Sequence, residues 1–236
     1  MKLITTVLLS SILLFSCSMK QEIFLKKEGS GTASIEIRLK SFVIPTIEDL
    51  AEVSPDIDPD DLLSPEKITE SLLKNPEVSN VNAVRPLKHV IKIDMDFGKI
   101  ENLFEQTEDE IKSSGLIEIE DLGDSKKLTL TVNKDTYRGF SSIIPNIDDP
   151  TMSALAPDPD MEISEGEYLD MIEFFFGDDG PAGILDSMMD IIIKVDGTVT
   201  DQRGGEKLNK STVEFKIPLI RILLLDKNLV YSVTYN

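Results

Sequence analysis

The chain has 236 residues, with 43 acidic and 24 basic side chains, a formal net charge of −19 and a single cysteine. A surface this negative repels phosphate backbones, which argues against nucleic acid as a partner. One cysteine cannot form an intramolecular disulfide, so a hydrophobic core must hold the fold, and the chain is long enough for one large domain.

The first seventeen residues predict an export signal. Lys2 gives a positive start, residues 3–16 are apolar or small, and Cys17 follows Ser16 directly. The apolar run of about fourteen residues is shorter than the roughly twenty that a membrane-spanning helix needs. A span across the membrane is therefore not expected from this segment.

The residues just before the cysteine resemble the lipobox of bacterial lipoproteins, with the sequence Leu14-Phe15-Ser16-Cys17. Phe15 departs from the small or β-branched residue usual at its position. This resemblance implies cleavage after Ser16, lipid on Cys17, and attachment to a cell membrane or outer membrane through acyl chains alone. The domain would face the periplasm or the exterior, and residues 1–16 would be a signal peptide.

After the cysteine, alternating and periodic patterns predict strand pairs with helices between them. Strands are expected at 22–27, 32–40, 78–85 and 88–97. A helical turn is expected at 46–53, and a longer helix from Pro65 to Lys74, because Ser64 can cap it and proline is favoured at the first helical position. Helices are also expected at 99–112 and 135–144, on either side of a hairpin formed by 116–121 and 126–132.

These elements predict one α+β domain over residues 17–236. An antiparallel sheet of about eight or nine strands would carry helices mainly on one face. Residues 145–162 contain four prolines among acids and small residues, which predicts a surface loop.

A capping box at Ser164 and Glu167 predicts a helix to Phe176, followed by a break at 177–180 and a second short apolar turn. The region 145–189 therefore combines a proline-rich loop with an apolar helical segment. Its aromatic and methionine side chains offer adaptable apolar surface that can line a ligand groove or simply form core. The residues of the candidate groove are Tyr168, Ile172, Phe175, Phe176, Ile184, Met188 and Met189.

The chain closes with strands expected at 190–200, 211–217 and 229–235. This part is similar to the C-terminal part of LppM-domain lipoproteins: a strand ending in a small turn, a hairpin with Gly and Asn, and a V-x-F strand shortly before a proline. The matching residues are Asp196, Gly197, Gly204, Gly205, Asn209, Val213, Phe215 and Pro218. The opening hairpin, KKEGSGTASIEI, fits the same family. The resemblance implies an envelope lipoprotein with an α+β domain that holds a lipid or other apolar ligand, and it brings no catalytic residues.

Other candidate sites are weaker. Asp56, Asp58 and Asp60 have the spacing that opens an EF-hand loop, but Asp61 and Lys67 stand at the glycine and glutamate positions. His89 is the single histidine and is expected at a strand edge. Without a second histidine or a free thiol, zinc ligation has no support, and no metal or cofactor is expected.

The sequence thus favours a non-enzymatic, lipid-anchored envelope protein that binds a lipid or apolar ligand. The alternative is a structural or protein-interaction lipoprotein without a pocket, and a third reading is a hydrolase that uses paired carboxylates.

Overall fold

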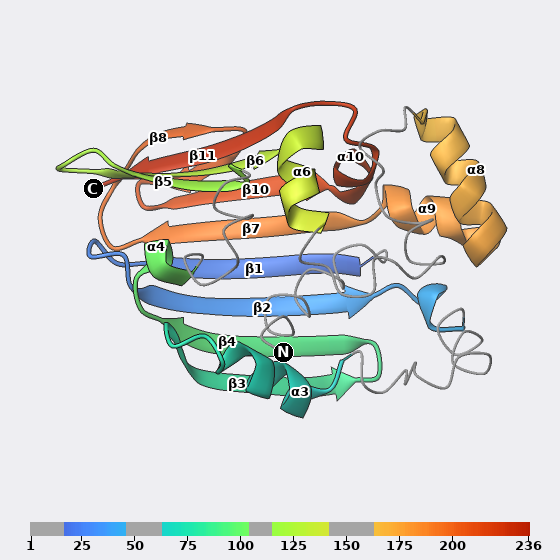
Figure 1. Cartoon of the computed structure of the whole chain (residues 1–236), viewed down its shortest axis with the longest axis horizontal. Coiled ribbons are helices and arrows are strands. Elements are labelled where there is room, and N and C mark those ends of the chain that lie inside the picture. Colours follow the sequence, from blue (N-terminus) through green and yellow to red (C-terminus); the bar gives the residue numbers. More distant parts are fainter. Residues whose placement is uncertain (1–16, 46–62, 104–114, 142–162) are drawn as a thin grey trace.

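The computed structural model describes residues 17–45, 63–103, 115–141 and 163–236. Two β-sheets and a set of short helices make up these parts of the chain (Figure 1). The predicted α+β class is confirmed. The strands divide into a sheet of seven and a sheet of four rather than forming one sheet of eight or nine.

The larger sheet has the strand order β3-β4-β2-β1-β7-β10-β9. Its pairs are antiparallel except for β1 and β7, which run parallel. The strands are β1 (Cys17–Leu25), β2 (Gly31–Leu39), β3 (Val78–Leu87), β4 (Val90–Phe97), β7 (Met188–Val195), β9 (Glu206–Asn209) and β10 (Thr212–Pro218).

The smaller sheet is antiparallel, with the order β5-β6-β11-β8. Its strands are β5 (Ile117–Asp121), β6 (Lys126–Val132), β8 (Val199–Arg203) and β11 (Leu229–Tyr235). The β5–β6 hairpin agrees with the prediction from the sequence. The helices are α3 (Pro65–Leu72), α4 (Ile100–Leu103), α6 (Lys134–Ser141), α8 (Glu165–Phe176), α9 (Asp179–Leu185) and α10 (Leu219–Leu224).

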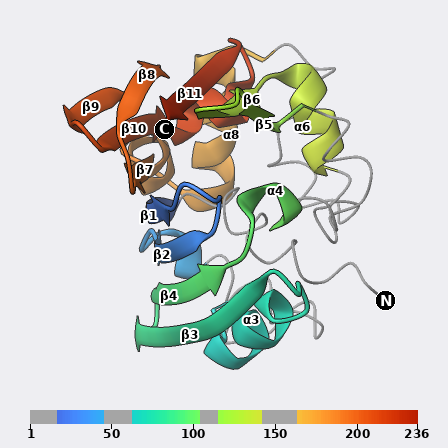
Figure 2. The same ribbon diagram turned by 90° about the vertical axis from the view of Figure 1, so that its left-hand side faces the viewer.

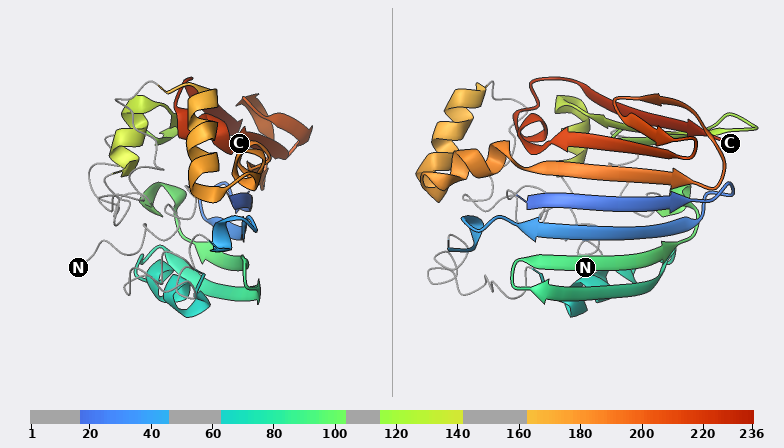
Figure 3. Two further views of the ribbon diagram at one scale, coloured as in Figure 1. Left: turned by 90° about the vertical axis from the view of Figure 1, so that its right-hand side faces the viewer. Right: turned by 180° about the vertical axis from the view of Figure 1, so that it is seen from behind.

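Helices α3, α4 and α6 lie on one side of the seven-stranded sheet (Figure 2). The other side of strands β3, β4, β2, β1 and β7 carries no helix within the described parts of the chain (right-hand view of Figure 3). Along β2 the side chains alternate strictly, with Ala33, Ile35 and Ile37 buried. This confirms the predicted sheet with one solvated face, because successive side chains of a strand point to opposite sides.

The open face is lined by charged side chains that pair across neighbouring strands. Lys92 lies 2.9 Å from a carboxylate oxygen of Glu36, and Lys194 lies 2.6 Å from one of Glu22. Surface pairs of this kind each contribute at most about 1 kcal/mol to stability. Their main effect is to keep this face solvated.

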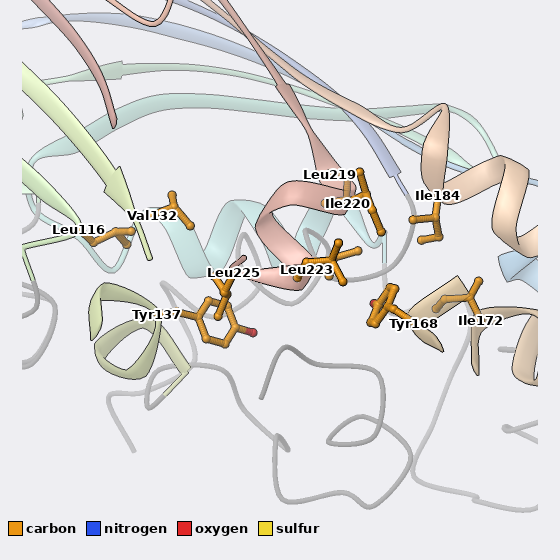
Figure 4. Packing of buried hydrophobic residues seen from close by; sticks show 11 residues of the cluster. Leu116, Val132, Tyr137, Tyr168, Ile172, Ile184, Leu219, Ile220, Leu223 and Leu225 are labelled. Atoms are coloured by element: carbon orange, nitrogen blue, oxygen red, sulfur yellow. The ribbon is translucent and has the colours of Figure 1, made fainter. Parts of the chain in front are cut away.

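Three groups of buried side chains hold the domain together. One lies beneath β2 and β4, and a second joins the two sheets, with Leu25, Ile193 and Val213 packed against Val233 and Tyr235. The third lies where α8, α9 and α10 meet (Figure 4). The second group explains why the four-stranded sheet covers the upper part of the seven-stranded one in Figure 2.

Several predicted elements fall partly or wholly beyond the described residues. The helical turn at 46–53 and the loop at 145–162 lie outside them, as does most of the helix expected at 99–112. The helix at 65–74 is confirmed as α3, with the Ser64 hydroxyl accepting a hydrogen bond from the Lys67 amide. Helix α10 was not predicted: the expected strand ended at residue 217, and the sequence analysis assigned no element to residues 219–224.

Candidate functional site

The candidate lipidation residue, Cys17, is the first residue of β1. Its backbone pairs with that of Leu39 at the end of β2, and the next inward-facing residue, Met19, is only 3% exposed. The single cysteine therefore lies within β1, with no spacer between it and the strand. Ser16 and the rest of 1–16 lie outside the described residues, so cleavage and lipidation stay predictions.

Strand β1, whose first residue is Cys17, starts at the end of the molecule where helices α8 and α9 lie (Figure 1). In the parallel register of β1 and β7, Met19 faces Met189, so continuing it by two residues brings Cys17 level with Ser187. Ser187 links the elements that meet here: its hydroxyl donates to the Gly183 carbonyl of α9 at 2.6 Å, and its carbonyl accepts from the amide of Leu219 at 3.0 Å.

Helix α8 begins with the capping box that the sequence predicted. The Ser164 hydroxyl accepts from the amide of Glu167, and the Glu167 carboxylate accepts from the amide of Ser164 at 3.0 Å. The hydrogen bonds from Ser164 hold the pKa of Glu167 below its usual range. At the same turn Glu165 lies 3.0 Å from the guanidinium of Arg221, which ties α8 to α10.

Three of the seven candidate groove residues are fully packed. Tyr168, Ile172 and Ile184 are 3%, 1% and 2% exposed, and Figure 4 shows them facing Leu219, Ile220 and Leu223 of α10. Burial raises the pKa of the Tyr168 phenol above its ordinary value. In this structure these three side chains therefore contribute to the core.

The other four candidate residues lie at the margins of this core. Phe175 and Phe176 are partly buried against it. Met188 and Met189 belong to β7 rather than to the short apolar turn expected from the sequence, and Met189 packs against the core beneath β2 and β4. The ligand groove stays a prediction.

Two glycines allow close packing around α9. A methyl group on Gly180 would lie 3.0 Å from a side-chain carbon of Ile172, and one on Gly183 would lie 1.9 Å from the ring of Phe42. The Phe42 ring in turn meets the Phe176 ring edge-on, with centroids 5.6 Å apart. The segment after β2 is thus clamped against the α8–α9 pair, which fixes these helices to the end of the large sheet.

Three large apolar side chains at this end are exposed. Phe174 of α8 is 84% exposed, Leu87 at the end of β3 is 52% exposed, and Leu185 at the end of α9 is 44% exposed. The sequence places Phe174 off the main apolar face of its helix, among the aromatic and methionine side chains that offer adaptable apolar surface. Its neighbour Phe175 packs edge-on against it, with centroids 5.3 Å apart.

A shallow pocket of about 250 Å³ lies on the open face of the large sheet, away from α8. Its polar walls include Glu22 and Lys194, which pair with each other, and Asp96, which accepts a hydrogen bond of 2.7 Å from the Asn80 side chain. Hydrogen bonds from Lys194 and then Lys20 lower the pKa of Glu22. Nothing in the sequence indicated this pocket, because it requires the register of β1, β2 and β4 and a bulge in β3 around Asn80.

The remaining sequence candidates are isolated or undescribed. His89 lies in the turn between β3 and β4 rather than within the expected strand, and its carbonyl accepts from the amide of Leu39. Asp56, Asp58 and Asp60 lie outside the described residues. Within the described ranges, no helix has the length and apolar character required to cross a bilayer.

The described residues form an α+β domain of two sheets, and the first strand, β1, starts at the single cysteine, Cys17. No family model and no curated protein matches the chain. The chain is similar in structure to the folded domain of LppM from Mycobacterium tuberculosis, determined by NMR, with 10% sequence identity and a TM-score of 0.45. The similarity covers 94% of this chain and 90% of the LppM domain. The resemblance to LppM-domain lipoproteins expected from the hairpin motifs is thus accompanied by a weak structural likeness over most of the chain.

Proposed function

We propose that this protein is a lipid-anchored lipoprotein of the bacterial cell envelope, with acyl chains on Cys17 and no enzymatic activity of its own. The observation that carries the proposal is the position of Cys17, where the signal-like apolar segment ends and the first strand of the sheet begins.

The charge of the domain supports attachment through lipid rather than through its surface. With a net charge of −19, the chain is repelled by anionic headgroups. One acyl chain binds a bilayer only marginally, at roughly 10⁴ M⁻¹, whereas two or more chains hold a protein stably. Two or three chains on Cys17 would therefore offset the repulsion without a membrane-spanning helix.

Metabolic labelling with a radioactive fatty acid tests this proposal. The wild-type protein should incorporate label, and Cys17→Ser should incorporate none. Ser18→Ala is the matched control, because it changes the adjacent small residue and leaves the cysteine in place. Persistent labelling of Cys17→Ser would contradict the proposal.

Binding of a lipid or other apolar ligand is the finer part of the proposal. It is supported by the half-buried Phe175 and Phe176 at the margin of the core formed by α8, α9 and α10. A native mass spectrum of the purified acylated protein would show a retained ligand as a further mass. The alternative, a structural or protein-binding lipoprotein, expects the acylated mass alone.

A further inference from the structure

Seven large apolar side chains are exposed among the described residues, and Phe174, at 84%, is the most exposed of them. Helices α8 and α9, which carry Phe174 and Leu185, lie at one end of the large sheet (Figure 1), and the register places Leu87, the last residue of β3, at the same end. That end is also where β1 starts. A large exposed aromatic side chain carries an unfavourable contact with water, which disappears when it enters an apolar or interfacial environment.

The register of the sheet relates these side chains to the anchor. Leu185 precedes Ser187, the residue level with Cys17, by two positions. Leu87, the last residue of β3, pairs with Val90 of β4, and Val90 pairs with Arg38 of β2. The next residue of β2, Leu39, is the partner of Cys17. Because no spacer separates Cys17 from β1, acyl chains on this residue would hold this end, and not another, against the membrane.

We propose that this end of the domain is a membrane-contact face, on which Phe174, with Leu185 and Leu87 at its margin, enters the interface of a neutral bilayer. This inference rests on the proposed lipid anchor and adds an orientation to it. Interfacial side chains enter to a depth of roughly 5–10 Å, at the boundary of headgroups and acyl chains. The open, charged face of the sheet would then stand roughly along the membrane normal and remain in water.

The charge around Phe174 specifies a neutral lipid surface. Residues 165–185 contain six acidic side chains and no lysine or arginine, and Glu173 is adjacent to Phe174. Anionic headgroups would repel this segment, whereas zwitterionic headgroups tolerate it. The face therefore differs from basic amphipathic surfaces that bind acidic lipids.

A tryptophan reporter tests the contact, because the chain contains no tryptophan. Phe174→Trp is made in the full-length protein, which is purified with its acyl chains and reconstituted into phosphatidylcholine vesicles. Lipids brominated near the headgroup should remove about half of the tryptophan emission, because an interfacial side chain lies within reach of the bromines. Adding phosphatidylglycerol should weaken the quenching.

Leu122→Trp is the matched control. Leu122 is 53% exposed, but it lies in the β5–β6 turn at the opposite end of the molecule, near the C-terminus (Figure 1). The Leu122→Trp protein carries the same anchor, and its tryptophan emission should not be quenched. Equal quenching at both positions, or none at position 174, would overturn the contact face, and stronger quenching with phosphatidylglycerol would overturn its preference for neutral lipid.

The intact mass of the same sample separates this inference from the proposed function. If the protein is acylated but the tryptophan at position 174 is not quenched, the lipid anchor is supported and the contact face is overturned. A protein without acyl chains overturns the anchor and, with it, this inference.

Discussion

Replacing Ile172 should be far more costly for the fold than replacing Phe174, although the two lie on the same helix only two residues apart. Ile172 is 1% exposed and Phe174 is 84% exposed. Ile172→Ala removes three carbons, worth about 2.4 kcal/mol at about 0.8 kcal/mol each. The cavity left against α9 and α10 raises the expected loss to about 3–4 kcal/mol.

Thermal unfolding of residues 17–236 carrying Cys17→Ser measures these losses without detergent. Ile172→Ala should lower Tm by about 10 °C, since 1 kcal/mol corresponds to about 2–4 °C in a domain of this size. Ile172→Val, which keeps most of the packing, should cost about 1 kcal/mol. Phe174→Ala should change stability by less than about 0.5 kcal/mol, as surface substitutions usually do.

Equal destabilisation by Phe174→Ala and Ile172→Ala would contradict this prediction. It would mean that the side of α8 carrying Phe174 also faces the core. The exposed aromatic side chain would then serve the fold rather than an external surface. A small loss for both variants would instead mean that α8 contributes little to the cooperative unit.

Two further predictions concern close packing and pH. Gly183→Ala should destabilise the domain, because its methyl group would lie 1.9 Å from the Phe42 ring. Gly166→Ala, with open space around it in α8, should stabilise the domain by about 0.5 kcal/mol. Urea unfolding of both variants measures the two changes, and equal effects would contradict the prediction. Burial, and secondarily the Glu101 carboxylate, raises the pKa of Tyr235 from 10.0 to about 12. The stability that this raised pKa contributes is therefore complete below pH 10 and is lost as the pH rises to about 12. Tm should fall over that pH range, and it should fall less in Tyr235→Phe. An identical dependence of Tm on pH in both proteins would refute the raised pKa of Tyr235.

Local signals in the sequence were sufficient for much of the fold. The alternation of Ala33, Ile35 and Ile37 identifies β2, and the residues around Gly123 identify the β5–β6 hairpin. Ser164 and Glu167 mark the start of α8 through a cap that involves only neighbouring residues. Such features depend on interactions a few residues apart, so they can be recognised without knowledge of the tertiary structure.

The parts that could not be predicted depend on distant residues. The division into two sheets follows from which strands find each other, and the apolar run of β7 is equally compatible with several partners. Helix α10 follows Pro218 with the residues LIRILL, whose apolar character suits a buried helix or a buried strand equally well. Tertiary packing against Tyr168 and Ile172 decides between them.

The candidate site shows the same division. The single cysteine was recognisable from its place after an apolar segment. By contrast, the seven residues of the expected groove share a composition that suits both a core and a pocket. Only the degree of burial separates Tyr168 and Ile172 from Phe175 and Phe176, and burial depends on where α10 packs.

The parallel pairing of β1 with β7 has a consequence for the time course of folding. Met19 faces Met189, which is 170 residues further along the chain. At a synthesis rate of about 5–20 residues per second, roughly 10–35 s pass between the synthesis of these two strands. Closing so long a loop also costs about 4–5 kcal/mol of chain entropy. The first strand made can pair early with β2, yet its other edge must wait for a late segment, so this edge is exposed to incorrect pairing throughout synthesis.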